Sequence, residues 1–457
     1  MWLPLFSQPE ALKAVPWGPK AARILAAALE AVEPGAAISR TLLRQGDVLL
    51  VSGKEYDLQH YRHVWMVGAG KAGAPMAKRT AEVLGDSLTG GLIIVKEGHI
   101  GDLRALPDRV ILVEAGHPVP DQRGVTGARQ IIELLADLNE DDLVICLISG
   151  GGSALLVSPA PGLSLSDLQS LTKALLACGA SIDEINTLRK HLEQLKGGGL
   201  ARLASPATVV TLVLSDVVGD PLDVIASGPT VPDPTSFADA WSVLGRYNLL
   251  DQMPASLILH LRSGLRGEQP DTPKPGDPLF DNIQNVIIGN NRQAALAALD
   301  QAQEEGFYGM LLTTQLQGEA RQVGRFLASI GRQIAASGEP IPRPACIVAG
   351  GETTVSLTGD GLGGRNQELA LGAVADLAGL DEIALITLAT DGGDGPTDAA
   401  GAIVTGRTLE RAQAIGLEPE CFLSRNDAYH FFDPLGDLIR TGPTQTNVTD
   451  LAFLFAF

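Results

Sequence analysis

Lys71 stands inside a glycine-rich segment whose spacing is typical of a nucleotide or phosphate loop. Gly68, Gly70 and Gly73 spell G-x-G-x-x-G directly after the apolar run 64–67. Such glycines let the backbone approach a bound pyrophosphate, so the pattern is the dinucleotide-binding fingerprint. A nicotinamide site needs no charge at this turn, whereas a phosphoryl group in transfer is stabilised by cations. The segment therefore leaves two chemistries open, hydride transfer and phosphoryl transfer, and we expect Gly70 to contact the ligand.

A second glycine cluster, Ser149–Ser153, follows another apolar run. Its three consecutive glycines, Gly150, Gly151 and Gly152, offer backbone N–H groups that can form an anion-binding nest. Tight turn packing is the alternative interpretation. We expect this loop to bind a phosphate or another anionic group of the substrate.

Carboxylates follow two further strand-like runs. Asp216 ends the β-branched run 208–215, and Asp391 and Asp394 lie in the segment "TDGGDGPTDAAG". Oxygen ligands suit Mg²⁺, and a carboxylate at a strand end can also accept a proton from an alcohol. We expect Asp391 and Asp394 to hold the metal and Asp216 to be catalytic. Solvated acidic turns and helix caps are the alternatives.

Arg365 opens a predicted helix, immediately after two glycines. The positive end of the helix dipole disfavours a cation, so a ligand is the better reason for an arginine at that position. Guanidinium groups bind carboxylates and phosphates in a bidentate way. We predict a catalytic role for Arg365, with Asn366 beside it and Glu352 after the preceding strand as substrate-binding residues.

The nicotinamide interpretation makes a further demand on the sequence. An acidic residue should lie about 20 positions after the glycines, and Glu97 lies near that place. Lys96 stands beside it, Lys71 occupies the phosphate-facing turn, and a carboxylate-rich loop has no role in hydride transfer. The spacing favours phosphoryl transfer without excluding a dehydrogenase.

The elements that must position these residues alternate along the chain. From residue 63 onward, β-branched runs alternate with helical patterns, which is typical of a parallel sheet covered on both faces. Ligands bind at the carboxyl ends of such strands, where the loops above lie. We predict an α/β fold with two α/β domains, the first a Rossmann-like three-layer sandwich, and an interdomain cleft. The expected domains are 1–240 and 241–444, and the apolar end 445–457 is a candidate strand of the first sheet.

Composition limits the partners. The chain has 34 Lys and Arg against 53 Asp and Glu, and the net charge is −19. Such a surplus repels nucleic acid and anionic membranes. No run reaches 18 apolar residues, and the start lacks the pattern of a signal peptide. We expect small-molecule substrates, no nucleic acid or membrane partner, a cytoplasmic location, and a monomer or homodimer.

Several segments together resemble a known family. "VGAGKAG", "SGGGSALL", "LSDVVGDPLDVIASGPT", "GGRNQELAL" and "ATDGGDGPTDAAGA" are similar to the motifs of class II glycerate 2-kinases, in order from about residue 18 to 457. The resemblance implies a Rossmann-like N-terminal domain, a C-terminal MOFRL domain and an active site between them. It also implies ATP-dependent phosphorylation of the C2 hydroxyl of D-glycerate, giving 2-phosphoglycerate, with Mg²⁺ or a similar ion.

The resemblance also assigns residues. Lys71 and Arg365 match the basic catalytic positions, and Asp216 and Asp391 match the acidic ones. One departure concerns Gln445, which replaces a glycine of the family's last motif, and a positive φ there would be strained. Two other functions stay open: an NAD(P)H-dependent hydroxypyruvate reductase and a non-catalytic sensor of sugar acids or nucleotides.

Overall fold

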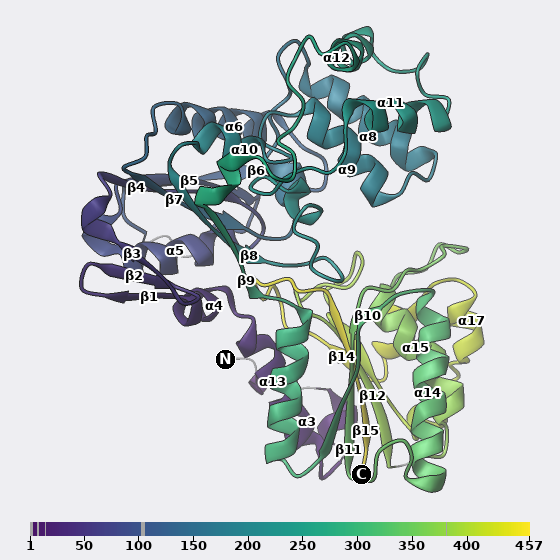
Figure 1. Cartoon of the computed structure of the whole chain (residues 1–457). Helices are drawn as coiled ribbons and strands as arrows, with labels where there is room; N and C mark the ends of the chain where they lie inside the picture. Colours follow the sequence, from purple (N-terminus) through teal and green to yellow (C-terminus); the bar gives the residue numbers. More distant parts are fainter. Residues whose placement is uncertain (1–2, 7–8, 14, 102–105, 381) are drawn as a thin grey trace. The chain divides into compact units, whose positions relative to one another are not determined.

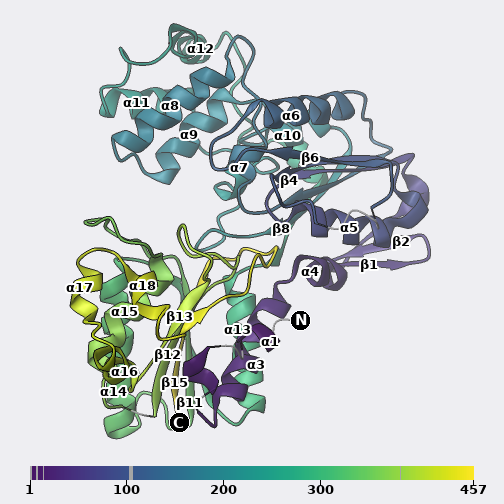
Figure 2. The same cartoon turned by 180° about the vertical axis from the view of Figure 1, so that it is seen from behind.

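The computed structural model describes residues 3–6, 9–13, 15–101, 106–380 and 382–457. These residues form two compact units (Figures 1 and 2). One, here called the inserted unit, comprises residues 37–288. The other, the terminal unit, joins residues 1–36 to 289–457. Helix α4 (Pro34–Thr41) links the two along the chain.

The inserted unit contains a six-stranded sheet in the order β6-β5-β4-β7-β8-β9. The pairs β4–β5, β4–β7, β5–β6 and β7–β8 are parallel, as the alternating pattern predicts. The strands are β4 (His63–Ala69), β5 (Gly90–Lys96), β6 (Val110–Ala115), β7 (Asp142–Ile148), β8 (Thr208–Leu214) and β9 (Ile283–Gly289).

Helices cover both faces of this sheet. Ile131 of α6 (Gln122–Leu135) shares a buried cluster with Leu92 and Ile94. The intervening Ile93 points to the opposite face, where it packs against Gly73 of α5 (Gly73–Leu84). This alternation along β5 follows from the period of two in a strand. The Rossmann-like three-layer sandwich is therefore confirmed.

Further elements surround that sandwich. A helical group in the same unit has its own apolar cluster, with Leu171, Leu188, Phe237 and Leu261 in its centre. Its helices are α8 (Leu165–Ala177), α9 (Ile182–Leu192), α11 (Phe237–Arg246) and α12 (Ala255–Leu265). The other elements are an antiparallel sheet of β1 (Leu42–Gln45), β2 (Val48–Val51) and β3 (Lys54–Asp57), the helices α7 (Gly152–Leu155) and α10 (Gly199–Ala204), and the 3-10 turns η1 (Leu58–His60), η2 (Gly85–Ser87), η4 (Ile225–Ser227) and η5 (Pro278–Asn282).

The domain boundary differs from the predicted division at residue 240. β9 is a strand of the first sheet, so residues 241–288 belong to the inserted unit. Asp271, in the proline- and glycine-rich segment 262–281, accepts a hydrogen bond from His191 Nε2 at 3.0 Å. Polar contacts of this kind hold an aperiodic segment in place without secondary structure.

The terminal unit contains a mixed sheet in the order β10-β11-β15-β12-β13-β14. Only the pair β10–β11 is parallel, and the other pairs are antiparallel, so the second α/β domain contains a mixed sheet. The strands are β10 (Tyr308–Leu316), β11 (Ala345–Gly351), β12 (Ile383–Ala389), β13 (Gly401–Thr405), β14 (Leu438–Ile439) and β15 (Asp450–Ala456).

β15 was a candidate for the first sheet, but it lies between β11 and β12 in the sheet of the terminal unit. Every residue in it is buried, as its apolar sequence requires of a central strand. Figure 1 shows α3 (Gly18–Ala31) and α13 (Asn291–Glu304) on one side of this sheet and α14 (Ala320–Ser337) and α15 (Arg365–Leu377) on the other. The remaining helices are α1 (Leu3–Phe6), α2 (Glu10–Lys13), α16 (Thr408–Ala414), α17 (Pro419–Leu423) and α18 (Ala428–Phe432).

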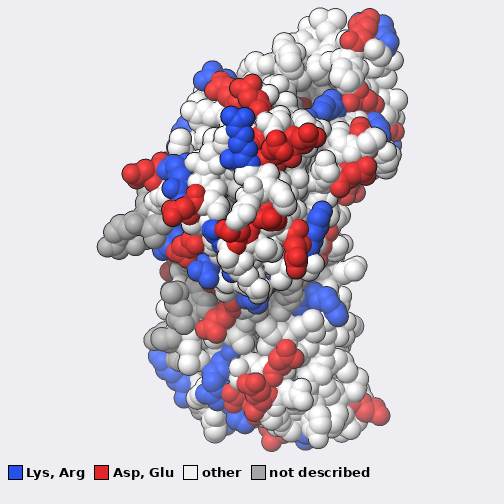
Figure 3. Space-filling model, turned by 60° about the vertical axis from the view of Figure 1, so that its left-hand side comes forward, with Lys and Arg blue, Asp and Glu red and all other residues white. Residues whose placement is uncertain are grey.

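One face of the molecule shows how its charged side chains are distributed. Acidic and basic side chains are interspersed over the face in Figure 3. Among the residues that the structure describes, no helix combines the length and apolar character needed to cross a bilayer.

Candidate active site

Two of the predicted loops meet in the inserted unit. The Lys71 N–H donates to Gly150 O at 2.8 Å, and the Ala72 N–H donates to Ser149 Oγ at 3.0 Å. Gly70 has φ +148, and a Cβ on it would lie 2.0 Å from Ser149 Oγ. Only glycine allows this approach, so the sequence brings Lys71 directly against the glycine cluster.

His117 joins the same place from the loop after β6. A Cβ on Gly151 (φ +83) would lie 3.1 Å from His117 Nε2 and 3.4 Å from Lys71 Cγ. Burial, together with the charges of Lys71, Lys96 and His99, lowers the pKa of His117 to about 4. The imidazole is therefore neutral at pH 7, beside a cationic lysine.

Ser153 ends the glycine cluster and connects it to residues that the sequence did not single out. Its Oγ lies 3.0 Å from Ser227 Oγ, which in turn donates to Asn186 Oδ1 of α9 at 3.0 Å. Ser227 is fully buried with φ +60. A non-glycine residue held at positive φ stores strain, which is typical of functional loops.

Asp216 follows β8, as predicted, and is half-buried. The loop after it contains two more non-glycine residues at positive φ, Asp220 (+56) and Ala226 (+50). Asp223 in the same loop receives a hydrogen bond from Lys190 Nζ at 3.4 Å. The loop is thus fixed by its polar contacts rather than by regular structure.

In the terminal unit, Arg365 lies at the first position of α15, as predicted, and contacts two carboxylates. Its Nε donates to Asp450 Oδ2 at 2.5 Å and its Nη2 donates to Asp450 Oδ1 at 3.1 Å. Nη1 lies 2.6 Å from Glu352 Oε1. Burial disfavours the charged form of Arg365 and so acts to lower its pKa, but these two carboxylates outweigh that effect and the pKa is raised. Glu352, which we predicted to bind substrate, thus forms an ion pair with Arg365, and its contact with substrate stays a prediction.

Asp450 is the functional candidate that sequence reasoning missed. It begins β15, and the residue before it, Thr449, is a β-branched residue at φ +67. Asn291 Nδ2 donates to Val448 O, Thr449 Oγ1 and Asp450 O, which holds this turn. The feature of the sequence that could have identified it is the position of Asp450 directly before the apolar run 451–457.

Asp394 caps α15. Its Oδ1 accepts the Asn366 N–H at 3.1 Å and its Oδ2 accepts the Gln367 N–H at 2.8 Å. Burial raises its pKa to about 7, although the helix N–H groups and Arg365 oppose that rise. A Cβ on Gly364 would lie 2.3 Å from Asp394 Cγ, so that glycine is required. These contacts favour a positioning role for Asp394 and also account for the burial of Asn366.

Asp391 follows β12 and is half-buried. Its Oδ1 accepts the Gly393 N–H at 3.2 Å. Burial raises the pKa of Asp450, and the charge of Asp391 adds to that rise. Asp398, in contrast, is exposed and bonded to Tyr429 and Arg440. Within the described ranges there is no group of three or more His, Cys, Asp or Glu residues that could hold a metal ion.

Comparison with known proteins defines the class. Residues 20–262 match a domain of unknown function (DUF4147), and residues 345–450 match the MOFRL family. The fold and these two regions place the chain among α/β proteins that combine both domains.

Individual relatives are more specific. D-glycerate 2-kinase of Thermotoga maritima is 43% identical over 97% of this chain and 98% of its own length. The crystal structure of glycerate kinase from Thermotoga maritima is 42% identical with a TM-score of 0.84, covering 95% of this chain and 98% of that one. An Agrobacterium vitis relative, 44% identical over 84% of this chain and 85% of its own, has hydroxypyruvate reductase as its provisional name. The chain belongs to the glycerate 2-kinase family.

Proposed function

We propose that the protein transfers the γ-phosphoryl group of ATP to the C2 hydroxyl of D-glycerate, giving 2-phosphoglycerate and ADP. The observation that carries the proposal is the meeting of the Lys71 loop with the Ser149–Ser153 loop in a member of this family. These loops follow the neighbouring parallel strands β4 and β7, and ligands bind at such strand ends.

The residues divide into cations and carboxylates. In the reaction the C2 oxygen bonds to phosphorus, the bond between phosphorus and the bridging oxygen of ADP breaks, and the hydroxyl proton passes to a carboxylate. Lys71 and Arg365 would stabilise the transferring group and the substrate carboxylate. Asp216 or Asp391 would orient the hydroxyl and accept its proton. The cleft between the domains stays a prediction.

The acidic residues near Arg365 fit a divalent cation. Asp391 adds negative charge beside the buried Asp450, and a cation would relieve that repulsion. We therefore propose Asp391 as the ligand of Mg²⁺, which would neutralise the ATP phosphates when bound. Both oxygens of Asp394 are already occupied by α15, so we assign it to positioning Arg365.

The reductase alternative depends on Glu97. In the structure its carboxylate accepts a hydrogen bond from Arg123 Nη2 at 2.8 Å, which competes with a ribose contact. Two assays decide between the functions. ³¹P NMR after incubation with ATP and D-glycerate should show 2-phosphoglycerate, and NADH should not be consumed with hydroxypyruvate in the absence of ATP. Rapid NADH turnover would overturn the proposal, and binding without either turnover would favour a sensor.

We also propose that the enzyme acts in the cytoplasm as a monomer or homodimer. Light scattering coupled to size-exclusion chromatography would distinguish those two states.

A further inference from the structure

Arg189 is a partly desolvated cation that makes no ion pair within the part of the chain that the structure describes. It lies in α9 and is half-buried. No hydrogen bond or ion pair within 4 Å joins its guanidinium to any residue that the structure describes. Burial lowers the pKa of Arg189, and the charge of Glu193 only partly opposes that effect. Arginine stays charged in proteins, so it cannot relieve this cost by losing a proton.

Glu193 is the anion whose charge acts on Arg189, but one of its two carboxylate oxygens already accepts two hydrogen bonds. Its Oε2 accepts a hydrogen bond from the buried Lys196 Nζ at 2.6 Å and another from the Ser158 N–H at 3.2 Å. Lys196 Nζ also donates to Leu156 O at 2.8 Å. With both cations charged, Arg189, Glu193 and Lys196 carry one positive charge in excess.

The position of Arg189 on α9 connects it with the glycine cluster. Asn186, three residues before it, accepts a hydrogen bond from Ser227, whose hydroxyl lies 3.0 Å from Ser153 Oγ. Glu193, four residues after it, bonds to Ser158. Residues three apart lie on one helix face, so Arg189 lies on the side of α9 that contacts Ser227, while Glu193 lies just beyond the C-terminal end of the helix.

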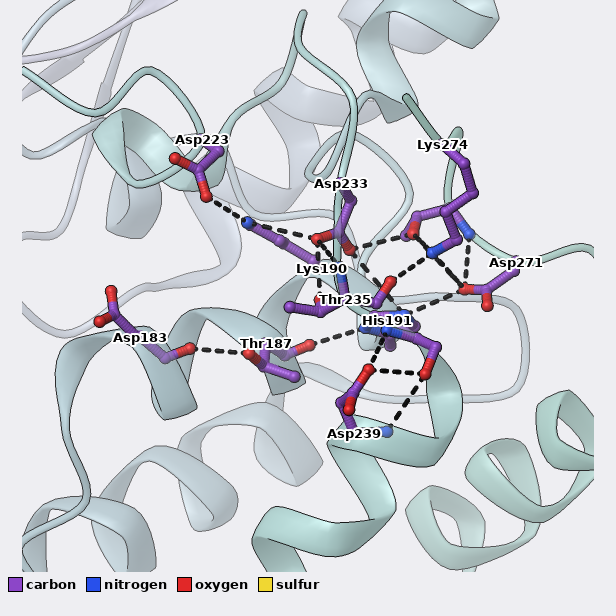
Figure 4. Close-up of polar contacts among 12 residues, drawn as sticks. Asp183, Thr187, Lys190, His191, Asp223, Asp233, Thr235, Asp239, Asp271 and Lys274 are labelled. Atoms are coloured by element: carbon purple, nitrogen blue, oxygen red, sulfur yellow. Dashed lines mark hydrogen bonds and ion pairs between the residues drawn. The ribbon is translucent and has the colours of Figure 1, made fainter. Parts of the chain in front are cut away.

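Two other cations, Lys190 and Arg365, each have two carboxylate partners. Figure 4 shows Lys190 between Asp223 and Asp233, and its Nζ lies 3.4 Å from a carboxylate oxygen of each. Arg365 contacts Asp450 and Glu352. Removing a charge from water without a partner is costly, and a ligand that supplies the partner recovers that cost on binding.

We propose that Arg189 binds an oxyanion of the substrates, either the carboxylate of the hydroxy acid or a phosphate of the nucleotide. This inference rests on the proposed function and deepens it. Arg189 would contribute to substrate binding beside the Ser149–Ser153 loop, and its planar guanidinium would fix the orientation of the anion through two parallel hydrogen bonds.

The experiment compares Arg189→Met with Arg129→Met, a control at an exposed position of α6, where Arg129 Nε lies 3.5 Å from Glu133 Oε1. KM for D-glycerate, KM for ATP and kcat are measured for both. Melting temperatures are recorded without ligand and with D-glycerate, ATP or inorganic phosphate added separately. Arg189→Lys tests whether binding needs the paired N–H groups of the guanidinium or only its positive charge.

For Arg189→Met we expect a KM for one substrate at least about tenfold higher, because a hydrogen bond to a charged group is worth that much. A higher KM for D-glycerate would identify the carboxylate as the bound anion, and a higher KM for ATP would identify a phosphate. The melting temperature without ligand should be unchanged or higher, since a poorly compensated charge is removed.

Kinetics equal to those of Arg129→Met would overturn the inference. A clear fall in melting temperature without ligand would also overturn it, because Arg189 would then be a structural residue. The changes in melting temperature on adding ligand distinguish a failure of the anion site from a failure of the proposed kinase activity. If the wild-type protein lacks kinase activity, a stabilisation by D-glycerate or ATP that disappears in Arg189→Met still supports the anion site.

Discussion

Among single residues, Lys71 is placed where charge on a transferring group can be stabilised, because its backbone is tied to Gly150. Lys71→Met should lower kcat/KM by about 10²–10³, the usual cost of removing one stabiliser of transition-state charge. A coupled assay of ADP release measures it. Lys173→Met, on an exposed position of α8, should leave the rate unchanged. A rate near wild type for Lys71→Met would remove this residue from the mechanism.

His117 gives a pH dependence. Its native pKa of about 4 lies below the ordinary value of 6.5, so between these values the unfolded chain binds a proton that the native protein does not. Its contribution to stability is complete above pH 6.5 and is lost as the pH falls toward 4. His117→Gln should therefore lose less melting temperature between pH 7.5 and pH 5 than the wild type. Parallel losses in both proteins would contradict this assignment.

Gln445 occupies a backbone conformation that favours glycine. It is exposed and has a φ of +64, which is the strained conformation that its replacement of a glycine suggested. Gln445→Gly should raise the free energy of unfolding by up to about 1 kcal/mol, since relief of strain exceeds the added entropy of the unfolded chain. Gly442 is also exposed at φ +64, and Gly442→Gln should lower the free energy of unfolding by a similar amount. Thermal melts of the two variants should move in opposite directions.

At the scale of elements, α15 depends on a carboxylate that lies outside it. Asp394→Ala would leave the Asn366 and Gln367 N–H groups without their acceptor and release the start of the helix. We expect a loss of about 1–2 kcal/mol in unfolding free energy, comparable to the loss of a helix cap. Activity should fall as well, because Arg365 is the first residue of α15. Asp398→Ala, an exposed change in the same loop, should cost less than about 1 kcal/mol.

The sequence predicted those elements whose pattern is local. Apolar runs identified β4, β7 and β8, and the glycine clusters at their ends identified the loops that meet there. The antiparallel sheet that residues 42–57 form around turns at Gly46 and Gly53 was not predicted. Strand direction in the second sheet was also unpredictable, because a buried antiparallel strand and a buried parallel strand have the same apolar composition.

The partners of the site residues were harder still to predict. Asp450 lies 85 positions from Arg365, and nothing in the local sequence indicates that they pair. Arg189 looked like one basic residue in an ordinary amphipathic helix. What distinguishes it is the lack of a partner among the described residues, and only the folded structure reveals that.

At the scale of the molecule, the inserted unit has its own sheet and its own apolar clusters. We expect the segment 37–288 to fold by itself and to melt cooperatively when followed by circular dichroism. The segment 1–240, which follows the division predicted from sequence, lacks β9 and α12 and should melt at a lower temperature or remain unfolded. Equal stability of the two segments would contradict the boundaries found in the structure.

The central place of β15 has a consequence for synthesis on the ribosome. β11 and β12 each pair with β15, so neither can complete its hydrogen bonding until residues 450–456 have left the ribosome. The inserted unit has been fully translated well before that moment. During translation the nascent chain therefore carries one unit able to fold beside a half-sheet with exposed strand edges, which is the state that chaperones recognise.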